Sequence, residues 1–155
     1  MEFDYVIVGG GSAGCVLANR LSADPKVTVC LLEAGGEDRN PWIHIPAGYI
    51  KTMVNPSLNW LFETQPHPKT GNRPIPVPRG KVLGGSSAIN AMLYVRGQVQ
   101  DYDTWAQMGC RGWSFEDVLP YFKRAEHREQ GADAYHGQGG PLNVTLPTQR
   151  YDILD

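Results

Sequence analysis

No stretch of about 18 consecutive apolar residues occurs in this chain, so no segment is predicted to span a membrane. Neither sign of charge is in excess, because 14 lysines and arginines face 16 aspartates and glutamates, for a formal net charge of −2. That balance provides no basic field for nucleic acid. The N-terminus has no charged region ahead of its first apolar run, so a signal peptide is not predicted. We expect a cytoplasmic protein, at most peripheral to the inner face of the membrane, with no nucleic-acid partner and no transmembrane segment.

Several sequence signatures of reactive sites are missing as well. The three cysteines form no C-x-x-C pair, which favours reduced core thiols over disulfides. The four histidines include no pair at helical i, i+4 spacing and no cluster with zinc-ligand spacing, so no metal site is predicted. A G-x-S-x-G elbow is absent, which leaves a hydrolase triad without an anchor.

Glycine and proline are plentiful, with 18 and 12 residues among the 155. They concentrate between Gly35 and Gly85 and again after Gly131, which indicates long shaped loops. The chain is long enough to bury one core of ordinary domain size, and 41% of its residues are hydrophobic.

The first 23 residues have the pattern strand, glycine turn, helix. Residues 3–8 are an apolar, β-branched run typical of a buried parallel strand, and residues 12–23 carry apolar side chains at helical spacing. Between them lies a G-x-G-x-x-G motif formed by Gly9, Gly11 and Gly14. Such glycines permit a tight turn, a close approach of backbone N–H groups to a pyrophosphate, and close packing of helix on strand. The alternative is a plain strand-to-helix turn that needs unusual backbone angles.

A second predicted strand, at residues 27–32, ends in Glu33. An acidic residue at this point can accept hydrogen bonds from a ribose hydroxyl. Its charge would repel a 2′-phosphate, so NADP is not expected at this site. These elements together predict an α/β fold, a Rossmann-like dinucleotide-binding domain with a parallel sheet and long irregular loops.

Residues 79–90 form a second chemically distinctive stretch. The glycine pair at 84–85 precedes two serines and a helix-compatible run, which predicts a helix N-terminus able to face an anion. Arg79 and Lys81 add positive charge beside it. Taken alone, the same pattern also describes an ordinary capped helix; after the dinucleotide motif, a second wall of one long cofactor site is the better interpretation.

Shorter patterns predict the remaining elements. These are a proline-punctuated extended segment at 40–48, a strand at 59–64, an extended segment at 73–78, a helix at 102–108 capped by Asp101, a helix that begins with a capping box at Ser114 and Asp117, and a half-buried strand at 141–146.

Together the motifs resemble the glucose–methanol–choline (GMC) oxidoreductases, in particular the choline-dehydrogenase-like and primary-alcohol dehydrogenase branch. The resemblance covers essentially the whole chain. The residues that carry it are Gly9 to Gly14 with Glu33, Asn59-Trp60, the run from Arg79 to Asn90, Tyr94-x-Arg96-Gly97, Asp101-Tyr102-Asp103-x-Trp105, and Tyr135-His136-Gly137-x-Gly139-Gly140-Pro141.

The resemblance implies FAD as the cofactor. Some family members attach the flavin through a histidine, and Ile89 occupies that position here, which implies FAD bound without a covalent bond. The implied cofactor-binding residues are Gly9, Gly11, Ser12, Ala13 and Gly14 at the pyrophosphate, Glu33 at the adenosine ribose, and Val82, Gly85, Asn90, Ala91, Met92 and Leu93 along the flavin end.

The resemblance also implies a reaction, in which a primary alcohol loses hydride from its CH–OH carbon to flavin N5. In the family, the histidine that takes the hydroxyl proton would lie beyond Asp155. We therefore expect no catalytic residue in this chain, an incomplete FAD-binding domain at 1–134, and the start of a substrate-binding domain at 135–155. The expected partners are a small-molecule alcohol and the missing C-terminal part of the same enzyme. Two alternatives stay open: a non-catalytic flavin- or adenylate-binding module made by truncation, and a flavin-dependent lyase or photodecarboxylase of the same fold.

Overall fold

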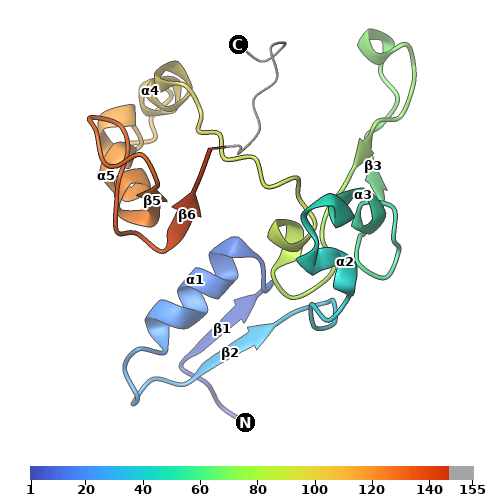
Figure 1. The fold of residues 1–155 in the computed structure, drawn as a ribbon, viewed down its shortest axis with the longest axis horizontal. Helices are drawn as coiled ribbons and strands as arrows, with labels where there is room; N and C mark the ends of the chain where they lie inside the picture. Colours follow the sequence, from blue (N-terminus) through green and yellow to red (C-terminus); the bar gives the residue numbers. More distant parts are fainter. Residues whose placement is uncertain (147–155) are drawn as a thin grey trace. The chain divides into compact units, whose positions relative to one another are not determined.

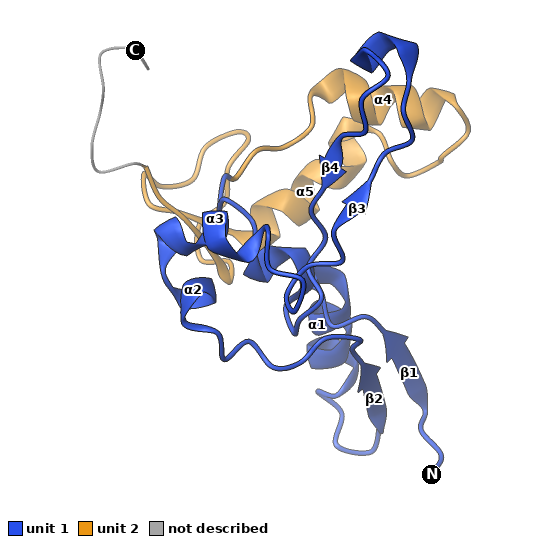
Figure 2. Ribbon diagram, turned by 90° about the vertical axis from the view of Figure 1, so that its right-hand side faces the viewer, with its two compact units in different colours: residues 1–93 blue, residues 94–155 orange. Residues whose placement is uncertain are grey.

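The computed structural model describes residues 1–146 and divides the chain into two compact units, Met1–Leu93 and a second unit that begins at Tyr94 (Figures 1 and 2). The expected domain boundary between residues 134 and 135 falls inside the second unit and stays a prediction. Residues 147–155, the end of the expected substrate-domain segment, lie outside the described residues. Within residues 1–146, no helix combines the length and apolar character needed to cross a membrane.

The dinucleotide-binding pattern at the N-terminus is confirmed as a β-α-β unit. Strand β1 (Tyr5–Val8) leads through the glycine turn into helix α1 (Ser12–Leu21) and then strand β2 (Val29–Leu32). The two strands are parallel, with Tyr5 opposite Val29 and Val8 opposite Leu32. Each strand begins two residues later than predicted, because the Asp4 carboxylate accepts hydrogen bonds from the backbone N–H and hydroxyl of Thr28 just before the ladder starts. Parallel strands joined by a helix are the framework of a Rossmann-like fold.

Two glycines make the turn between β1 and α1 possible. Gly9 has φ of 99°, a conformation that other residues rarely adopt, and its N–H donates to the Leu32 carbonyl at 2.7 Å. Gly14 is buried in α1, where a Cβ atom would lie 1.9 Å from the Gly9 carbonyl oxygen. The helix can therefore approach the turn this closely only because position 14 carries no side chain.

The segment after β2 differs from its prediction. Residues 40–48, expected to be extended, contain helix α2 (Pro41–His44) and a 3₁₀ turn, η1 (Pro46–Gly48), followed by helix α3 (Tyr49–Thr52). Asn40 caps α2 by accepting a hydrogen bond from Trp42 N–H at 3.0 Å, and proline suits the first helical position because it needs no donor there. Proline thus starts a helix here instead of preventing one.

An antiparallel hairpin and a tight turn complete the first unit. Strands β3 (Phe62–Glu63) and β4 (Pro76–Val77) pair across a tip that carries the 3₁₀ turn η2 (Pro68–Thr70) (Figure 2). The helix predicted after Gly84-Gly85 is only one 3₁₀ turn, η3 (Gly85–Ala88). Both glycines have positive φ, which suits a sharp turn better than the start of a regular α-helix.

The second unit is built from two helices and a short parallel strand pair. Helices α4 (Val99–Gln107) and α5 (Phe115–Ala125) precede strands β5 (Glu126–Arg128) and β6 (Leu142–Val144), with Glu126 opposite Leu142 (Figure 1). The predicted capping box at Ser114 and Asp117 is confirmed. Helix α4 starts earlier than predicted, because Gln98 is its N-cap and Asp101 completes a capping box from the third helical position. Strand β5 was not predicted.

Replacing Gly14 tests the close packing in the dinucleotide-binding unit. Gly14→Ala would place a methyl group against the Gly9 carbonyl, so we expect the free energy of unfolding to fall by about 1–3 kcal/mol. Gly36→Ala is the matched control, because a Cβ there meets no described atom within 4 Å, and its change should stay within about 0.5 kcal/mol. Denaturant unfolding of both variants measures this. If Gly14→Ala and Gly36→Ala had the same free energy of unfolding, the packing of helix α1 would not depend on the absence of a side chain at position 14.

Candidate cofactor-binding site

A cavity of about 530 Å³ opens in the first unit at the carboxyl ends of β1 and β2. This is where α/β folds place their ligands, and the volume lies in the usual range for ligand sites. Its walls come from the glycine turn, the end of β2 and the segment around residues 79–86. The lining residues are Val8, Gly9, Gly11, Leu32, Glu33, Ala34, Trp60, Arg79, Gly80, Gly85 and Ser86.

Glycine contacts hold these walls together. Gly84 N–H donates to the Gly10 carbonyl at 2.7 Å, which joins the segment around residues 79–86 to the first glycine turn. A Cβ at Gly85 would lie 2.9 Å from the Gly11 Cα, so the two backbones touch at this point. A Cβ at Gly80 would lie 2.1 Å from the Gly85 carbonyl oxygen. A side chain at either position would therefore collide with the neighbouring backbone and push these segments apart.

The N-terminus of helix α1 lies at the cavity. Its N-cap is Gly11, and no side chain within the described residues caps this end. The first intrahelical bond runs from Cys15 N–H to the Gly11 carbonyl at 2.9 Å. The N–H groups of the first turn, at Ser12, Ala13 and Gly14, are therefore the ones that an α-helix leaves for an external acceptor. With the helix dipole, they favour a negatively charged group such as a phosphate.

Glu33 supplies the acidic group of the cavity wall. Its Oε2 accepts a hydrogen bond from Gly10 N–H at 2.7 Å, and its Oε1 accepts one from Gly35 N–H at 2.8 Å. An ionised carboxylate can accept about four hydrogen bonds, so two backbone donors leave capacity for ligand hydroxyls. The position matches the prediction made from the sequence, while the two backbone contacts were not predicted.

Seven lining residues were absent from the predicted cofactor set: Val8, Leu32, Ala34, Trp60, Arg79, Gly80 and Ser86. The charge of Arg79 was noted in the sequence, but its place in the wall depends on Asn59. The amide oxygen of Asn59, a side chain only 2% exposed, accepts a hydrogen bond from Arg79 N–H at 2.9 Å. Trp60 stacks on Phe62 with ring centroids 5.8 Å apart. No local pattern signals such contacts between distant segments.

The structure separates the predicted cofactor residues into four groups. Gly9, Gly11, Glu33 and Gly85 line the cavity, and Ser12, Ala13 and Gly14 form the first turn of the adjacent helix. Val82 is fully buried in a hydrophobic cluster with Leu58 and Ile89 and is not part of the cavity wall, so its expected role along the flavin stays a prediction. Asn90, Ala91, Met92 and Leu93 are not part of the cavity wall, and their expected role along the flavin stays a prediction.

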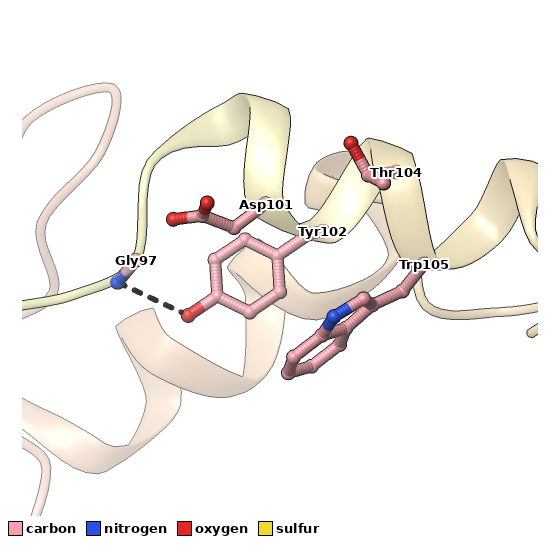
Figure 3. Close-up of a pocket in the computed structure, with 5 residues that line it drawn as sticks. All are labelled: Gly97, Asp101, Tyr102, Thr104 and Trp105. Atoms are coloured by element: carbon pink, nitrogen blue, oxygen red, sulfur yellow. Dashed lines mark hydrogen bonds between the residues drawn. The ribbon is translucent and has the colours of Figure 1, made fainter. Parts of the chain in front are cut away.

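The second unit has a pocket of about 340 Å³ around Tyr102 and Trp105 (Figure 3). Its polar groups already have partners in the local structure. The Tyr102 hydroxyl accepts from Gly97 N–H at 3.2 Å, and the Asp101 carboxylate accepts from Gln98 N–H at 2.8 Å. The Thr104 hydroxyl donates to the Gln100 carbonyl at 2.6 Å. This pocket is therefore a weaker candidate than the glycine-lined cavity.

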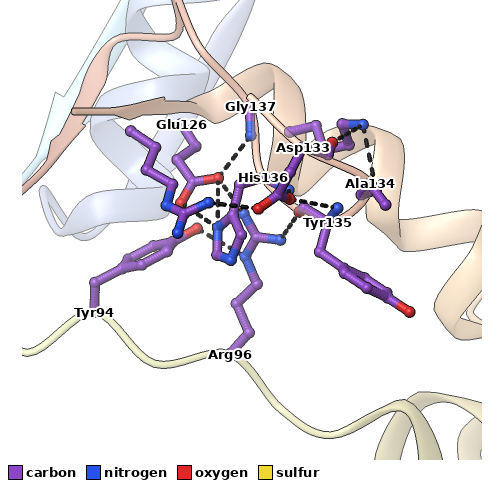
Figure 4. A network of polar contacts seen from close by, with 10 residues as sticks. Tyr94, Arg96, Glu126, Asp133, Ala134, Tyr135, His136 and Gly137 are labelled. Carbon is purple, nitrogen blue, oxygen red and sulfur yellow. Dashed lines mark hydrogen bonds and ion pairs between the residues drawn. The ribbon is translucent and has the colours of Figure 1, made fainter. Parts of the chain in front are cut away.

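A buried ion cluster surrounds Glu126, whose side chain is fully buried (Figure 4). Its carboxylate accepts hydrogen bonds from Arg96 Nη2 at 2.6 Å and Gly137 N–H at 2.8 Å, and lies 3.0 Å from Nδ1 of His136. Burial raises the pKa of Glu126, but the Gly137 and His136 hydrogen bonds and the Arg96 charge together hold that pKa below its ordinary value. Arg96 also lies over the Phe122 ring, 5.0 Å from its centroid. The charged groups of this cluster are paired with one another and with neighbouring backbone, which indicates a structural role.

Within the part of the chain that the structure describes, no metal centre competes with the glycine-lined cavity as a functional site. Among residues 1–146, no group of three or more histidine, cysteine or acidic side chains is arranged to hold a metal ion.

Comparison with known proteins identifies the family. A sequence profile described as GMC oxidoreductase matches residues 3–152. This chain belongs to the GMC oxidoreductase family. Among its relatives is an oxygen-dependent choline dehydrogenase from Sinorhizobium fredii, 51% identical over 144 residues, which are 93% of this chain and 26% of that protein.

Solved structures of GMC oxidoreductases and related flavoproteins have the same fold. Pyridoxine 4-oxidase from Mesorbium loti superimposes with a TM-score of 0.86 at 42% identity, over 94% of this chain and 29% of its own. An FAD-dependent oxidoreductase from Chaetomium thermophilum superimposes with a TM-score of 0.79 at 32% identity, over 99% of this chain and 28% of its own. The α/β, Rossmann-like fold class predicted from the sequence is thereby confirmed. The chain spans about a quarter of the length of these relatives.

The ion cluster of the second unit makes its stability depend on pH. The pKa of Glu126 is lowered in the folded state. Its contribution to the free energy of unfolding is therefore complete above the ordinary glutamate pKa, and it is lost as the pH falls through the folded-state pKa. Glu126→Ala should cost about 3–5 kcal/mol at neutral pH, because it leaves Arg96 buried without its partner, and should flatten the acid dependence. Thermal unfolding between neutral and acidic pH measures both effects. The same substitution at the exposed Glu116 is the control, and equal pH profiles for the two variants would contradict this assignment.

Proposed function

We propose that this chain forms the cofactor-binding part of an FAD-dependent enzyme that oxidises the CH–OH group of a primary alcohol. The observation that carries the proposal is the glycine-lined cavity at the carboxyl ends of β1 and β2, flanked by Glu33 and the uncapped start of α1. Backbone N–H groups, a helix dipole and an acid at a strand end are the groups that recognise a dinucleotide.

The residues fit FAD in their chemistry. Gly9, Gly11 and the first turn of α1 would hold the pyrophosphate, with Arg79 adding positive charge, while Glu33 would accept hydrogen bonds from the adenosine ribose. Gly11 and Gly85, which both line the cavity, present only backbone to a ligand because neither carries a side chain. When bound, FAD would supply the hydride acceptor for the oxidation.

The kind of substrate is proposed from the family and its relatives. The names of two relatives refer to choline and to pyridoxine, and both of these compounds carry a primary hydroxyl group. A small alcohol is therefore the substrate class that we propose.

We propose that the catalytic base lies outside this chain. All four histidines are engaged in local structure. His44 Nε2 lies 2.6 Å from the Asp38 carbonyl, and His136 contacts Glu126. Nδ1 of His67 accepts a hydrogen bond from Lys69 N–H, and Nδ1 of His127 accepts one from Gly139 N–H.

Besides the alcohol substrate, we propose that this chain packs against a further, C-terminal part of the same enzyme. Apolar side chains on β1 and α1 support this proposal, because Val8 is 84% exposed and Val16 is 59% exposed, and such surfaces are normally covered.

We further propose that FAD is bound without a covalent link. Ile89 occupies the position at which a histidine would attach the flavin, and its hydrocarbon side chain is only 3% exposed. Acid precipitation of the complete protein should therefore release the yellow cofactor into the supernatant, as absorbance of the two fractions would measure. Colour that stays with the washed pellet would overturn this proposal.

The activity is tested by mixing the complete, flavin-loaded protein with primary alcohols in the absence of oxygen. We expect bleaching of the flavin absorbance by at least one small primary alcohol, because hydride transfer reduces the flavin. A bound flavin that no alcohol reduces would favour one of the alternatives, a lyase or photodecarboxylase of the same fold. A protein that binds no flavin would contradict the proposed function altogether.

A further inference from the structure

We propose that Glu33 is a positioning residue that holds the cofactor cavity in shape before any ligand binds, in addition to its expected contact with a ribose. The shaping role concerns the protein alone, while its consequence for flavin affinity rests on the proposed function.

The two oxygens of Glu33 serve two different segments. Oε2 accepts from Gly10 in the first glycine turn at 2.7 Å, and Oε1 accepts from Gly35 just after β2 at 2.8 Å. Hydrogen bonds from backbone N–H groups to a charged acceptor are among the stronger ones in proteins. One side chain therefore fixes the distance between the turn and the segment that leaves β2.

Both of these segments also hold the third wall of the cavity. The Gly10 carbonyl accepts from Gly84 N–H at 2.7 Å, and the Gly36 carbonyl accepts from Leu83 N–H at 2.9 Å. Gly35 itself packs on this wall, since a Cβ there would lie 2.1 Å from the Lys81 carbonyl carbon. The carboxylate of Glu33 thus lies at the junction of all three glycine-rich segments.

No other side chain duplicates this arrangement among the described residues. The start of α1 has no side-chain cap. Besides Glu33, the glycine turn is held by the bond from Gly9 N–H to the Leu32 carbonyl, by the bond from Gly84 N–H to the Gly10 carbonyl, and by the Cys15 thiol, which donates to the Gly10 carbonyl at 3.2 Å. The shaping role also leaves room for the ligand role. Two of about four acceptor sites on the carboxylate bind backbone donors, which leaves about two for a ligand in the cavity that Glu33 lines.

Glu33→Gln separates these roles with little change in size. Glutamine offers one acceptor oxygen, and its NH₂ group is only a donor, so either Gly10 or Gly35 loses its partner. Amide exchange of that glycine should become roughly 10- to 100-fold faster, the change expected when one hydrogen bond to a charged group is lost. Glu37→Gln is the matched control, because Glu37 is exposed and pairs only with the exposed Arg39 among the described residues.

The experiment measures hydrogen exchange in the complete protein, freed of flavin, for peptides that contain Gly10 or Gly35. We expect slow exchange at both glycines in the unchanged protein and faster exchange at one of them in Glu33→Gln but not in Glu37→Gln. If both glycines of the unchanged protein exchange as fast as its exposed loops, the proposal is overturned. This part of the experiment uses only the unchanged protein, so it does not depend on folding of the variant. Unchanged exchange in Glu33→Gln would overturn it equally.

Binding of FMN then tests the functional consequence, because FMN lacks the adenosine ribose. A residue that only contacts this ribose would leave FMN affinity unchanged, whereas a positioning residue weakens both FMN and FAD binding. We expect Glu33→Gln to raise both dissociation constants, and an unchanged FMN constant would overturn the consequence for binding. If the unchanged protein binds neither flavin, the proposed function fails, while the exchange experiment still decides the shaping role.

Discussion

The first unit depends on a close approach of backbones that only glycine permits. Gly14 lies against the Gly9 carbonyl, Gly35 against Lys81, Gly80 against the Gly85 carbonyl, and Gly85 against Gly11. At each contact a Cβ atom would fall within 3.0 Å of another backbone, well inside ordinary contact distance. These contacts bring the strand ends, the start of α1 and the segment around residues 79–86 to one place. Four of the eleven residues that line the cavity, Gly9, Gly11, Gly80 and Gly85, carry no side chain.

Backbone packing of this kind has to satisfy its polar groups, and acidic side chains do much of this in both units. Glu33 accepts from two glycine N–H groups, and Glu126 accepts from Gly137 N–H as well as Arg96. Asp133 accepts from the N–H groups of Tyr135 and His136, which holds its pKa below the ordinary value. Within residues 1–146, no buried side-chain polar atom lacks a hydrogen bond. In the loops, carboxylates therefore accept hydrogen bonds from backbone N–H groups that a helix or a sheet would otherwise satisfy.

Local sequence patterns predicted the helices and strands that form through contacts between residues close in sequence. The β-α-β unit follows from apolar periodicity and glycine spacing, and the helix that starts after Ser114 follows from its capping box. The extended reading of residues 40–48 was wrong because Asn40 caps a helix that proline begins, and the helix expected after Gly84 is a single 3₁₀ turn. The Glu126 cluster was missed because Arg96 lies 30 residues before it in the sequence.

The cavity shows the same difference between residues predicted by local patterns and residues brought in by contacts between distant segments. Gly9, Gly11 and Glu33 follow from the pattern of the first 33 residues and line the cavity, while their role toward a cofactor stays a prediction. Trp60 and Arg79 reach it only through pairing of distant segments, since Trp60 N–H donates to the Arg79 carbonyl at 2.9 Å. Val82 was expected along the flavin end, and its side chain lies buried in a hydrophobic cluster. A motif assigns a position to a site without showing which way the side chain points, so that role of Val82 stays a prediction.

A crystal structure of the complete protein with bound flavin tests the central claim most directly. The account predicts the pyrophosphate against Gly11 and the first turn of α1, with a ribose hydroxyl on the Glu33 carboxylate. A flavin bound elsewhere, with this cavity filled by water or by another segment of the protein, would contradict it.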